Sequence, residues 1–149
     1  MPGVYISYPF CAQKCTYCNF ASGVLPRELE SRYVETLCKS IAQTEWPWTP
    51  ETVYLGGGTP SQMDVDALAM LLVGIPGTPE NARWGEATME CAPGTITRER
   101  VDAWRNAGIN RVSLGVQSFV DRELARTGRK HNAGIVESDV RILRDAGID

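Results

Sequence analysis

Short strand patterns alternate with amphipathic helix patterns along this chain, and this alternation narrows its fold more than any other feature. Each strand pattern is bounded by turn-forming residues, and each helix pattern carries an apolar stripe. Strands are expected at 4–8, 52–55, 87–91 and 111–116, and helices over 29–41, 65–73, 97–107 and 132–143. Such alternation predicts a parallel sheet with right-handed crossovers. The fold class is therefore α/β, either part of a (β/α) barrel or an open doubly wound sheet.

The ends of the helix patterns carry residues that cap or stop a helix. Thr97 and Asn132 stand where a side-chain oxygen caps a first turn, and Gly108 stops the third helix. A loop is expected at 76–79, which contains two prolines and a glycine. These signals support the assigned order of elements.

A six-residue pattern occurs twice, each time at the end of a helix. Residues 105–110 (RNAGIN) lead into the fourth strand, and residues 144–149 (RDAGID) stand where a fifth strand is due. A parallel sheet that stops there leaves the backbone of its last strand unpaired, which complete proteins cover or close. We therefore expect an N-terminal fragment, with residues 1–149 forming one domain that is incomplete at its C-terminus.

Composition and charge argue against several classes of function. The net charge is −3, which gives no reason to expect the basic face that binds nucleic acid. The longest apolar run, residues 67–75, has nine residues, against about 18 for a membrane-spanning helix. The N-terminus has no basic segment followed by a long apolar stretch, so no secretory signal is expected. We expect a cytoplasmic protein with no nucleic-acid partner and no membrane span.

Three of the five cysteines, Cys11, Cys15 and Cys18, stand within eight residues directly after the first strand. In a parallel α/β fold this is the carboxyl edge of the sheet, where ligand sites gather. Thiolates favour iron–sulfur clusters, zinc or copper, and each iron of a 4Fe–4S cluster takes one outer ligand. The three cysteines therefore predict a 4Fe–4S cluster with one iron left open.

Two other interpretations of the cysteines stay open. A structural zinc site closes with four ligands, commonly in two pairs. No second pair is evident, because His131 is far along the chain, Cys38 falls in the first helix and Cys91 on the third strand. A disulfide leaves one thiol over and needs an oxidising compartment.

The spacing Cys-x3-Cys-x2-Cys, with Tyr17 before the last cysteine, resembles the signature of the radical S-adenosylmethionine (radical SAM) superfamily. The resemblance implies a radical SAM core domain, here the first four strand–helix units of a TIM-like (β/α) barrel. It also implies that S-adenosylmethionine chelates the open iron and, on taking an electron from the reduced cluster, yields a 5′-deoxyadenosyl radical. The cofactors then carry the chemistry, and the protein positions them.

Further motifs resemble those of the oxygen-independent coproporphyrinogen III oxidase group and its relatives. They are the segments 4–11 (VYISYPFC), 54–60 (YLGGGTP), 89–95 (MECAPGT) and 112–119 (VSLGVQSF), with Arg129 further on. The three glycines also have a physical reading, because a backbone without Cβ atoms can approach a ligand closely. A plain tight turn is the alternative, and a nucleotide P-loop is not expected because no Lys-Ser/Thr pair follows.

The resemblance assigns ligand contacts to eight residues. In the related oxidases, residues matching Tyr5, Gly57 and Glu90 contact the cluster-bound S-adenosylmethionine, and those matching Tyr17, Gly58, Thr59, Gln117 and Arg129 contact a second molecule. The residues alone add that a buried acid such as Glu90 needs a polar partner. Without the resemblance, the two tyrosines are better explained by core packing and Arg129 by a solvated surface charge.

One position separates two branches of this group. The related oxidases carry a fourth cysteine two residues after the third, whereas here Asn19 and Phe20 follow Cys18. This departure resembles the heme chaperone branch. Two further departures are Ser7, where the group usually has a histidine, and Ala92, where it usually has an asparagine.

The branch assignment sets the expected function and partners. A heme chaperone of this type binds a 4Fe–4S cluster, S-adenosylmethionine and heme, and delivers heme to an acceptor protein. An electron donor is a further expected partner. The alternative function is that of an oxygen-independent coproporphyrinogen III oxidase, which oxidatively decarboxylates propionate side chains in porphyrin biosynthesis. Whether the protein is an enzyme depends on which of the two holds.

Overall fold

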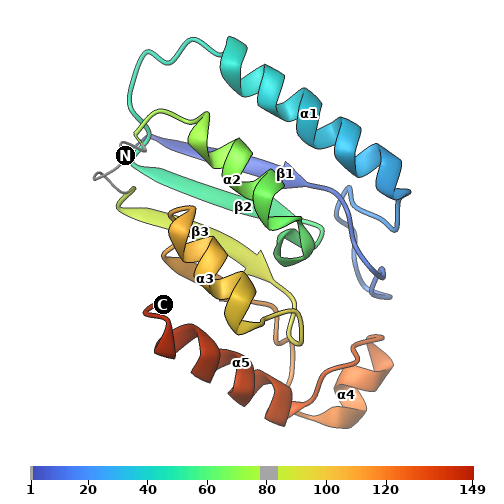
Figure 1. Ribbon diagram of the computed structural model, residues 1–149. Helices are drawn as coiled ribbons and strands as arrows, with labels where there is room; N and C mark the ends of the chain where they lie inside the picture. Colours follow the sequence, from blue (N-terminus) through green and yellow to red (C-terminus); the bar gives the residue numbers. More distant parts are fainter. Residues whose placement is uncertain (1, 78–83) are drawn as a thin grey trace.

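A parallel sheet forms the centre of the computed structural model, which describes residues 2–77 and 84–149 (Figure 1). Within these residues the strands lie side by side in chain order: β1 (Gly3–Tyr8), β2 (Thr52–Gly57), β3 (Glu86–Cys91) and β4 (Arg111–Leu114). In register, Tyr5 pairs with Tyr54, and Glu90 pairs with Ser113. Pro79 of the expected 76–79 loop lies outside the described residues.

The crossover helices cover one face of this sheet (Figure 1). They are α1 (Arg27–Gln43), α2 (Val65–Val73), α3 (Arg98–Asn106) and α5 (Ala133–Asp145), with the short helices η1 (Pro60–Gln62) and α4 (Asp121–Arg126) in the connections. A doubly wound sheet reverses its strand order and has helices on both faces. Sequential strands with helices on one face form the wall of a (β/α) barrel, as the resemblance implied.

Side chains alternate between the two faces of the sheet along each strand, and this explains why the helices cover only one face. Ile6, Leu55 and Met89 point toward the helices and are at most 3% exposed. They pack with a helix layer whose most buried members include Leu71 and Trp104. The opposite face carries a different set, which includes Tyr5, Tyr54, Glu90 and Ser113. The apolar core therefore lies between sheet and helices, and the other face of the sheet is largely polar.

The predicted helix caps are present. Thr97 accepts a hydrogen bond from the backbone N–H of Arg100, and Asn132 accepts one from Ile135. Gly108 adopts a positive φ of 104° after α3, a conformation that glycine enters without strain. The sequence predicted no element between the strand expected at 111–116 and the helix expected over 132–143, but α4 lies in this connection and begins without a side-chain cap.

The repeated pattern at 105–110 and 144–149 is also a structural repeat. Gly108 and Gly147 both have positive φ, and the isoleucine after each is at most 2% exposed. At the end of the first copy, the N–H of Asn110 donates to the carbonyl of Ala87 in β3. After the second, the N–H of Asp149 donates to Asn110, next to β4. Each copy thus turns the chain from a helix to the next edge of the sheet.

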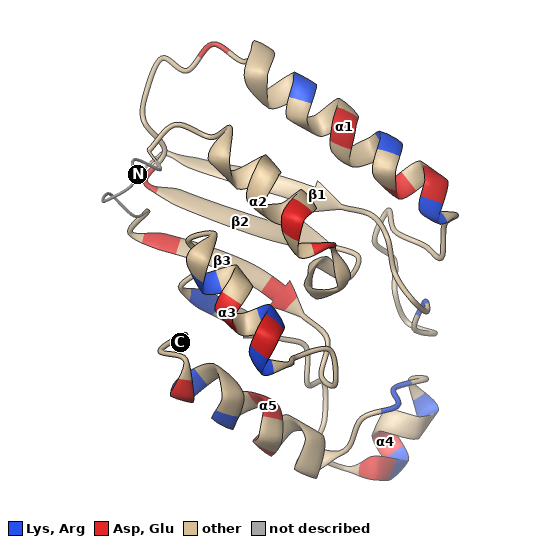
Figure 2. Cartoon of the chain, in the orientation of Figure 1, with Lys and Arg blue, Asp and Glu red and all other residues tan. Residues whose placement is uncertain are grey.

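Charged side chains of both signs are interspersed along α1, α3 and α5 (Figure 2). Several form i,i+4 ion pairs on exposed faces, including Glu35 with Lys39 and Asp102 with Arg98. Solvent screens such exposed pairs, so each contributes little to stability. Among the described residues, none of the helices combines the length and hydropathy needed to cross a bilayer.

Candidate functional site

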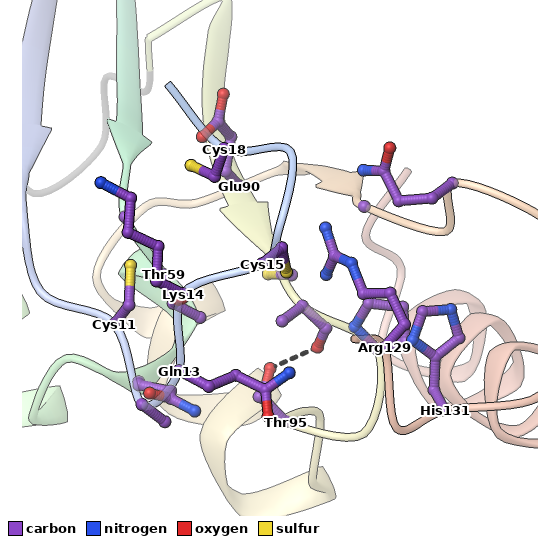
Figure 3. Close-up of a pocket in the computed structure, with 18 of the residues that line it drawn as sticks. Cys11, Gln13, Lys14, Cys15, Cys18, Thr59, Glu90, Thr95, Arg129 and His131 are labelled. Atoms are coloured by element: carbon purple, nitrogen blue, oxygen red, sulfur yellow. Dashed lines mark hydrogen bonds between the residues drawn. The ribbon is translucent and has the colours of Figure 1, made fainter. Parts of the chain in front are cut away.

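A cavity of about 610 Å³ lies at the carboxyl ends of the strands (Figure 3). Its walls come from the loop after β1, the ends of β2, β3 and β4, and the connection between α4 and α5. Ten of the eleven predicted site residues line it: Cys11, Cys15, Tyr17, Cys18, Gly57, Gly58, Thr59, Glu90, Gln117 and Arg129. Tyr5 is the exception. The fold therefore gathers residues from distant parts of the sequence around one space.

The loop that carries the three cysteines, residues 11–23, is closed at its base. The N–H of Cys11 donates to the carbonyl of Gly23 at 2.9 Å, and the N–H of Gly23 donates to Pro9 at 2.9 Å. Lys14 crosses the loop and donates through Nζ to the carbonyl of Ser22 at 3.0 Å. These bonds hold the cysteine loop as a compact unit, and its thiols lie at the cavity (Figure 3).

Helix α1 fixes the chain immediately before Cys11. The hydroxyl of Tyr8, a side chain only 2% exposed, donates to Glu30 Oε1 at 2.5 Å. Burial and the neighbouring Glu30 carboxylate both raise the pKa of Tyr8, so the phenol stays protonated as a donor. Tyr33 donates to the carbonyl of Ser7, and its ring meets Phe10 edge-on at 5.6 Å. The first metal-ligand candidate therefore follows a rigidly held strand end.

The glycine turn after β2 packs directly against the base of the cysteine loop. Gly58 donates its N–H to the carbonyl of Tyr8 at 2.6 Å, and Thr59 donates to Phe10 at 2.9 Å. A Cβ atom at Gly58 would lie 2.4 Å from the Phe10 carbonyl oxygen, closer than atoms can pack. Gly57 has a φ of 115°, which L side chains rarely adopt. Glycine is therefore required at both positions.

Glu90 is held by two donors. Its Oε2 accepts the N–H of Gly57 at 3.0 Å, and its Oε1 accepts the hydroxyl of Tyr54 at 2.9 Å. Burial and the Glu90 carboxylate raise the pKa of Tyr54. Tyr5 stacks on Tyr54 with ring centroids 5.7 Å apart, so Tyr5 connects to the site through Tyr54 rather than by lining the cavity.

Arg129 faces the cavity from the α4–α5 connection (Figure 3). Its Nε and Nη2 atoms donate to the hydroxyl of Tyr17 at 3.1 and 2.7 Å, and the guanidinium carbon lies 5.9 Å from the tyrosine ring centroid. Within residues 2–77 and 84–149, no carboxylate pairs with this guanidinium. A cation beside a cavity without an acidic partner suits an anionic ligand group.

Several lining residues were not identified from the sequence. Among them are Gln13, Lys14, Thr95, Lys130 and His131. Thr95 bonds to the fully buried Ser61 through the two hydroxyl groups at 2.7 Å. The only sequence signals among these residues are the position of Gln13 and Lys14 between cysteines and that of Thr95 at the end of the 89–95 motif. The polar partners that Glu90 was expected to need are supplied by the Gly57 N–H and by Tyr54, whose strand register is set only by folding.

The chemistry of these residues fits the cofactors that the cysteine pattern predicted. The thiols of Cys11, Cys15 and Cys18 are free and half-buried, and all three line the cavity. In the described part of the chain, no three His, Cys, Asp or Glu side chains are grouped for a single metal ion. A 4Fe–4S cluster makes a different demand, because each thiolate binds its own iron. Arg129, which has no carboxylate partner in the part of the chain that the structure describes, suits the carboxylate of S-adenosylmethionine.

Comparison with known proteins identifies the family. Residues 5–149 match the model of the radical SAM superfamily. The chain belongs to this superfamily. Members of the superfamily hold a 4Fe–4S cluster and S-adenosylmethionine, which agrees with the cysteines and the cavity described above.

The radical SAM relatives include proteins named heme chaperone HemW. The chain is 35% identical to HemW of Synechocystis sp. over 97% of its own length and 37% of the relative. It is 39% identical to HemW of Escherichia coli K12 over 86% of its length and 35% of the relative. The chain thus spans well under half the length of these curated relatives.

Among solved radical SAM structures, the coproporphyrinogen III oxidase HemN of Escherichia coli superposes with a TM-score of 0.83. The similarity covers 99% of this chain and 35% of that one, at 24% sequence identity. This similarity shows the fold, and it confirms the predicted partial barrel of the radical SAM type.

Proposed function

We propose that Cys11, Cys15 and Cys18 each bind one iron of a 4Fe–4S cluster and leave the fourth iron to S-adenosylmethionine. The observation that carries this proposal is that three free thiols line one cavity together with Arg129, which has no acidic partner among the described residues. A bound cluster supplies one-electron chemistry. The chain itself supplies the thiolates, the shape of the cavity and the charges around it.

The residues around the cluster site have distinct roles in this proposal. The glycine turn at Gly57 and Gly58 offers closely approaching backbone to the amino-acid end of S-adenosylmethionine. Glu90, oriented by Tyr54, supplies a carboxylate for its ammonium group. Arg129 supplies the charge that the carboxylate of a second S-adenosylmethionine needs. Tyr17, Thr59 and Gln117 line the same space and are proposed to contact a second molecule of S-adenosylmethionine.

We further propose that the whole protein is a heme chaperone, which binds heme and transfers it to an acceptor protein. Two observations support this proposal: curated relatives at 35% and 39% identity are named heme chaperones, and Asn19 and Phe20 follow Cys18 in place of a fourth cysteine. An electron donor is a further proposed partner. The free state of all five cysteines suits the reducing cytoplasm that we propose as its location.

Heme titration of the full-length protein tests the chaperone proposal. A saturable shift of the Soret band, followed by transfer of heme to an apo-acceptor, is the expected result. Absence of a saturable shift would contradict it. In that case an anaerobic assay with dithionite decides the alternative, because an oxidase converts coproporphyrinogen III to protoporphyrinogen.

A further inference from the structure

The short connection between α4 and α5, residues 127–132, contacts two separate walls of the cavity. On one side, the carbonyl of Gly128 accepts a hydrogen bond from Gln13 Nε2 at 2.6 Å, and Arg129 bonds to Tyr17. Both partners belong to the cysteine loop. On the other side, His131 Nε2 lies 2.9 Å from the carbonyl oxygen of Val116, in the turn after β4. The 127–132 connection therefore links the cysteine loop to the end of β4.

The turn after β4 is strained at Gln117. Its φ is 67°, and within the described residues it is the one non-glycine residue with a positive φ. The N–H of Ser118 donates to the carbonyl of Val116 at 2.8 Å, which closes a three-residue γ-turn centred on Gln117. Such a backbone conformation is disfavoured for a residue with a side chain and persists only where the surroundings enforce it. Some group outside the turn must therefore hold it.

His131 is placed to hold this turn. The imidazole is only 8% exposed, and Nε2 approaches the same Val116 oxygen that Ser118 uses. Because a carbonyl oxygen only accepts, Nε2 carries the proton in this contact. His131 also lines the cavity beside Arg129 (Figure 3). One carbonyl thus joins the strained turn to the connection that positions the arginine.

We propose that His131 is a positioning residue that holds the γ-turn. It thereby directs Gln117 into the cavity that Arg129 also lines. This inference rests on the proposed function in one respect: the ligand that Gln117 and Arg129 meet is S-adenosylmethionine. The holding of the turn is independent of the ligand. With Nε2 committed to Val116, the histidine acts on the backbone geometry of the turn.

Hydrogen exchange in the reconstituted protein tests the positioning role directly. His131→Leu removes the donor, and we expect exchange at residues 116–119 to rise about threefold to tenfold, the range for one lost hydrogen bond. His131→Gln retains an N–H donor and should restore much of the protection. Val136→Ala is the matched control, because it truncates a buried α5 side chain and leaves the His131 donor in place. Unchanged exchange at 116–119 in His131→Leu would overturn the proposal.

Affinity for S-adenosylmethionine provides the second readout. His131→Leu should weaken binding by about threefold to tenfold with iron and sulfide content unchanged, and His131→Gln and Val136→Ala should stay close to wild type. Equal weakening in His131→Leu and Val136→Ala would contradict a positioning role. If the wild-type protein binds no S-adenosylmethionine while exchange still responds to His131→Leu, the proposed ligand is wrong and the positioning of the turn stands.

Discussion

The thiol of Cys91 and the thiols of the 11–23 loop lie in different surroundings. Cys91 is 4% exposed on the helix-covered face of β3, and burial raises its pKa to about 12. Cys11, Cys15 and Cys18 are half-buried beside the cavity. Because the thiolate is the reactive form, Cys91 is an inert core residue and the loop cysteines are accessible.

Alkylation of the cluster-free protein checks this difference. With iodoacetamide at pH 8, we expect the three loop cysteines to be modified while Cys91 stays unmodified until urea unfolds the chain. Mass spectrometry of the peptides gives the extent at each site. Modification of Cys91 at the rate of Cys15 under native conditions would contradict the account of the core.

Gly58 is expected to be the least replaceable residue of the glycine turn. Gly58→Ala drives a Cβ into the Phe10 carbonyl, so we expect a destabilisation of about 1–3 kcal/mol and a lower iron content, because Phe10 precedes Cys11. Gly23→Ala is the control, since a Cβ there meets no atom within 4 Å. Urea unfolding and iron analysis give both quantities. Equal effects of the two substitutions would count against the steric explanation.

Among single residues, the sequence revealed those whose chemistry is visible in a pattern and missed those whose role comes from packing. The cysteine spacing, the glycine turn and the family resemblance together predicted ten of the residues that line the cavity. Tyr54 and His131 were not predicted, because their partners Glu90 and Val116 become neighbours only in the folded chain. The positive φ of Gln117 leaves no trace in its residue type.

Helix α5 anchors a second wall of the cavity through Asp139. This side chain is 4% exposed and accepts the N–H of Gly94, in the loop after β3, at 2.7 Å. Burial raises the pKa of Asp139 above its ordinary value of 3.8, although the Gly94 bond and the charge of His131 oppose the shift. The folded state therefore holds this proton more tightly than the unfolded chain.

The raised pKa of Asp139 makes the stability of the folded chain depend on pH in a definite direction. Above pH 3.8 the unfolded chain loses the Asp139 proton before the folded chain does, so this carboxyl's contribution to stability falls as pH rises toward its folded pKa. Asp139→Asn does not ionise and keeps an acceptor for Gly94. Its stability relative to wild type should therefore increase with pH over this range. Urea unfolding at a series of pH values measures the difference, and a constant or falling difference would contradict the prediction.

Most elements could be predicted from sequence, and the exceptions have physical reasons. The strand expected at 111–116 ends at Leu114, because the chain turns sharply at Val116 and Gln117. Helix α4 was expected to be loop, since its six residues are too few to show an apolar stripe and no side chain caps its start. By contrast, Thr97 and Asn132 cap the helices that follow them, as predicted.

On the scale of the whole molecule, sequential parallel strands with helices on one face place every strand's carboxyl end at the same edge (Figure 1). That geometry brings the cysteine loop, the glycine turn, Glu90 and the 127–132 connection around one cavity. Strand order could not be read from the sequence, which allowed both a barrel wall and a doubly wound sheet. Because the helices cover a single face of the sheet (Figure 1), the sheet is the wall of a barrel and not a doubly wound sheet.

The central claim is that three cysteines hold a 4Fe–4S cluster whose open iron binds S-adenosylmethionine. Its most direct test is anaerobic reconstitution with iron and sulfide, followed by electron paramagnetic resonance of the reduced protein with and without S-adenosylmethionine. We predict a reduced-cluster signal that shifts when S-adenosylmethionine is added, is abolished by alanine at Cys11, Cys15 or Cys18, and survives Cys38→Ala. A protein that binds about one zinc and no iron or sulfide, or a cluster signal unaffected by S-adenosylmethionine, would contradict the claim.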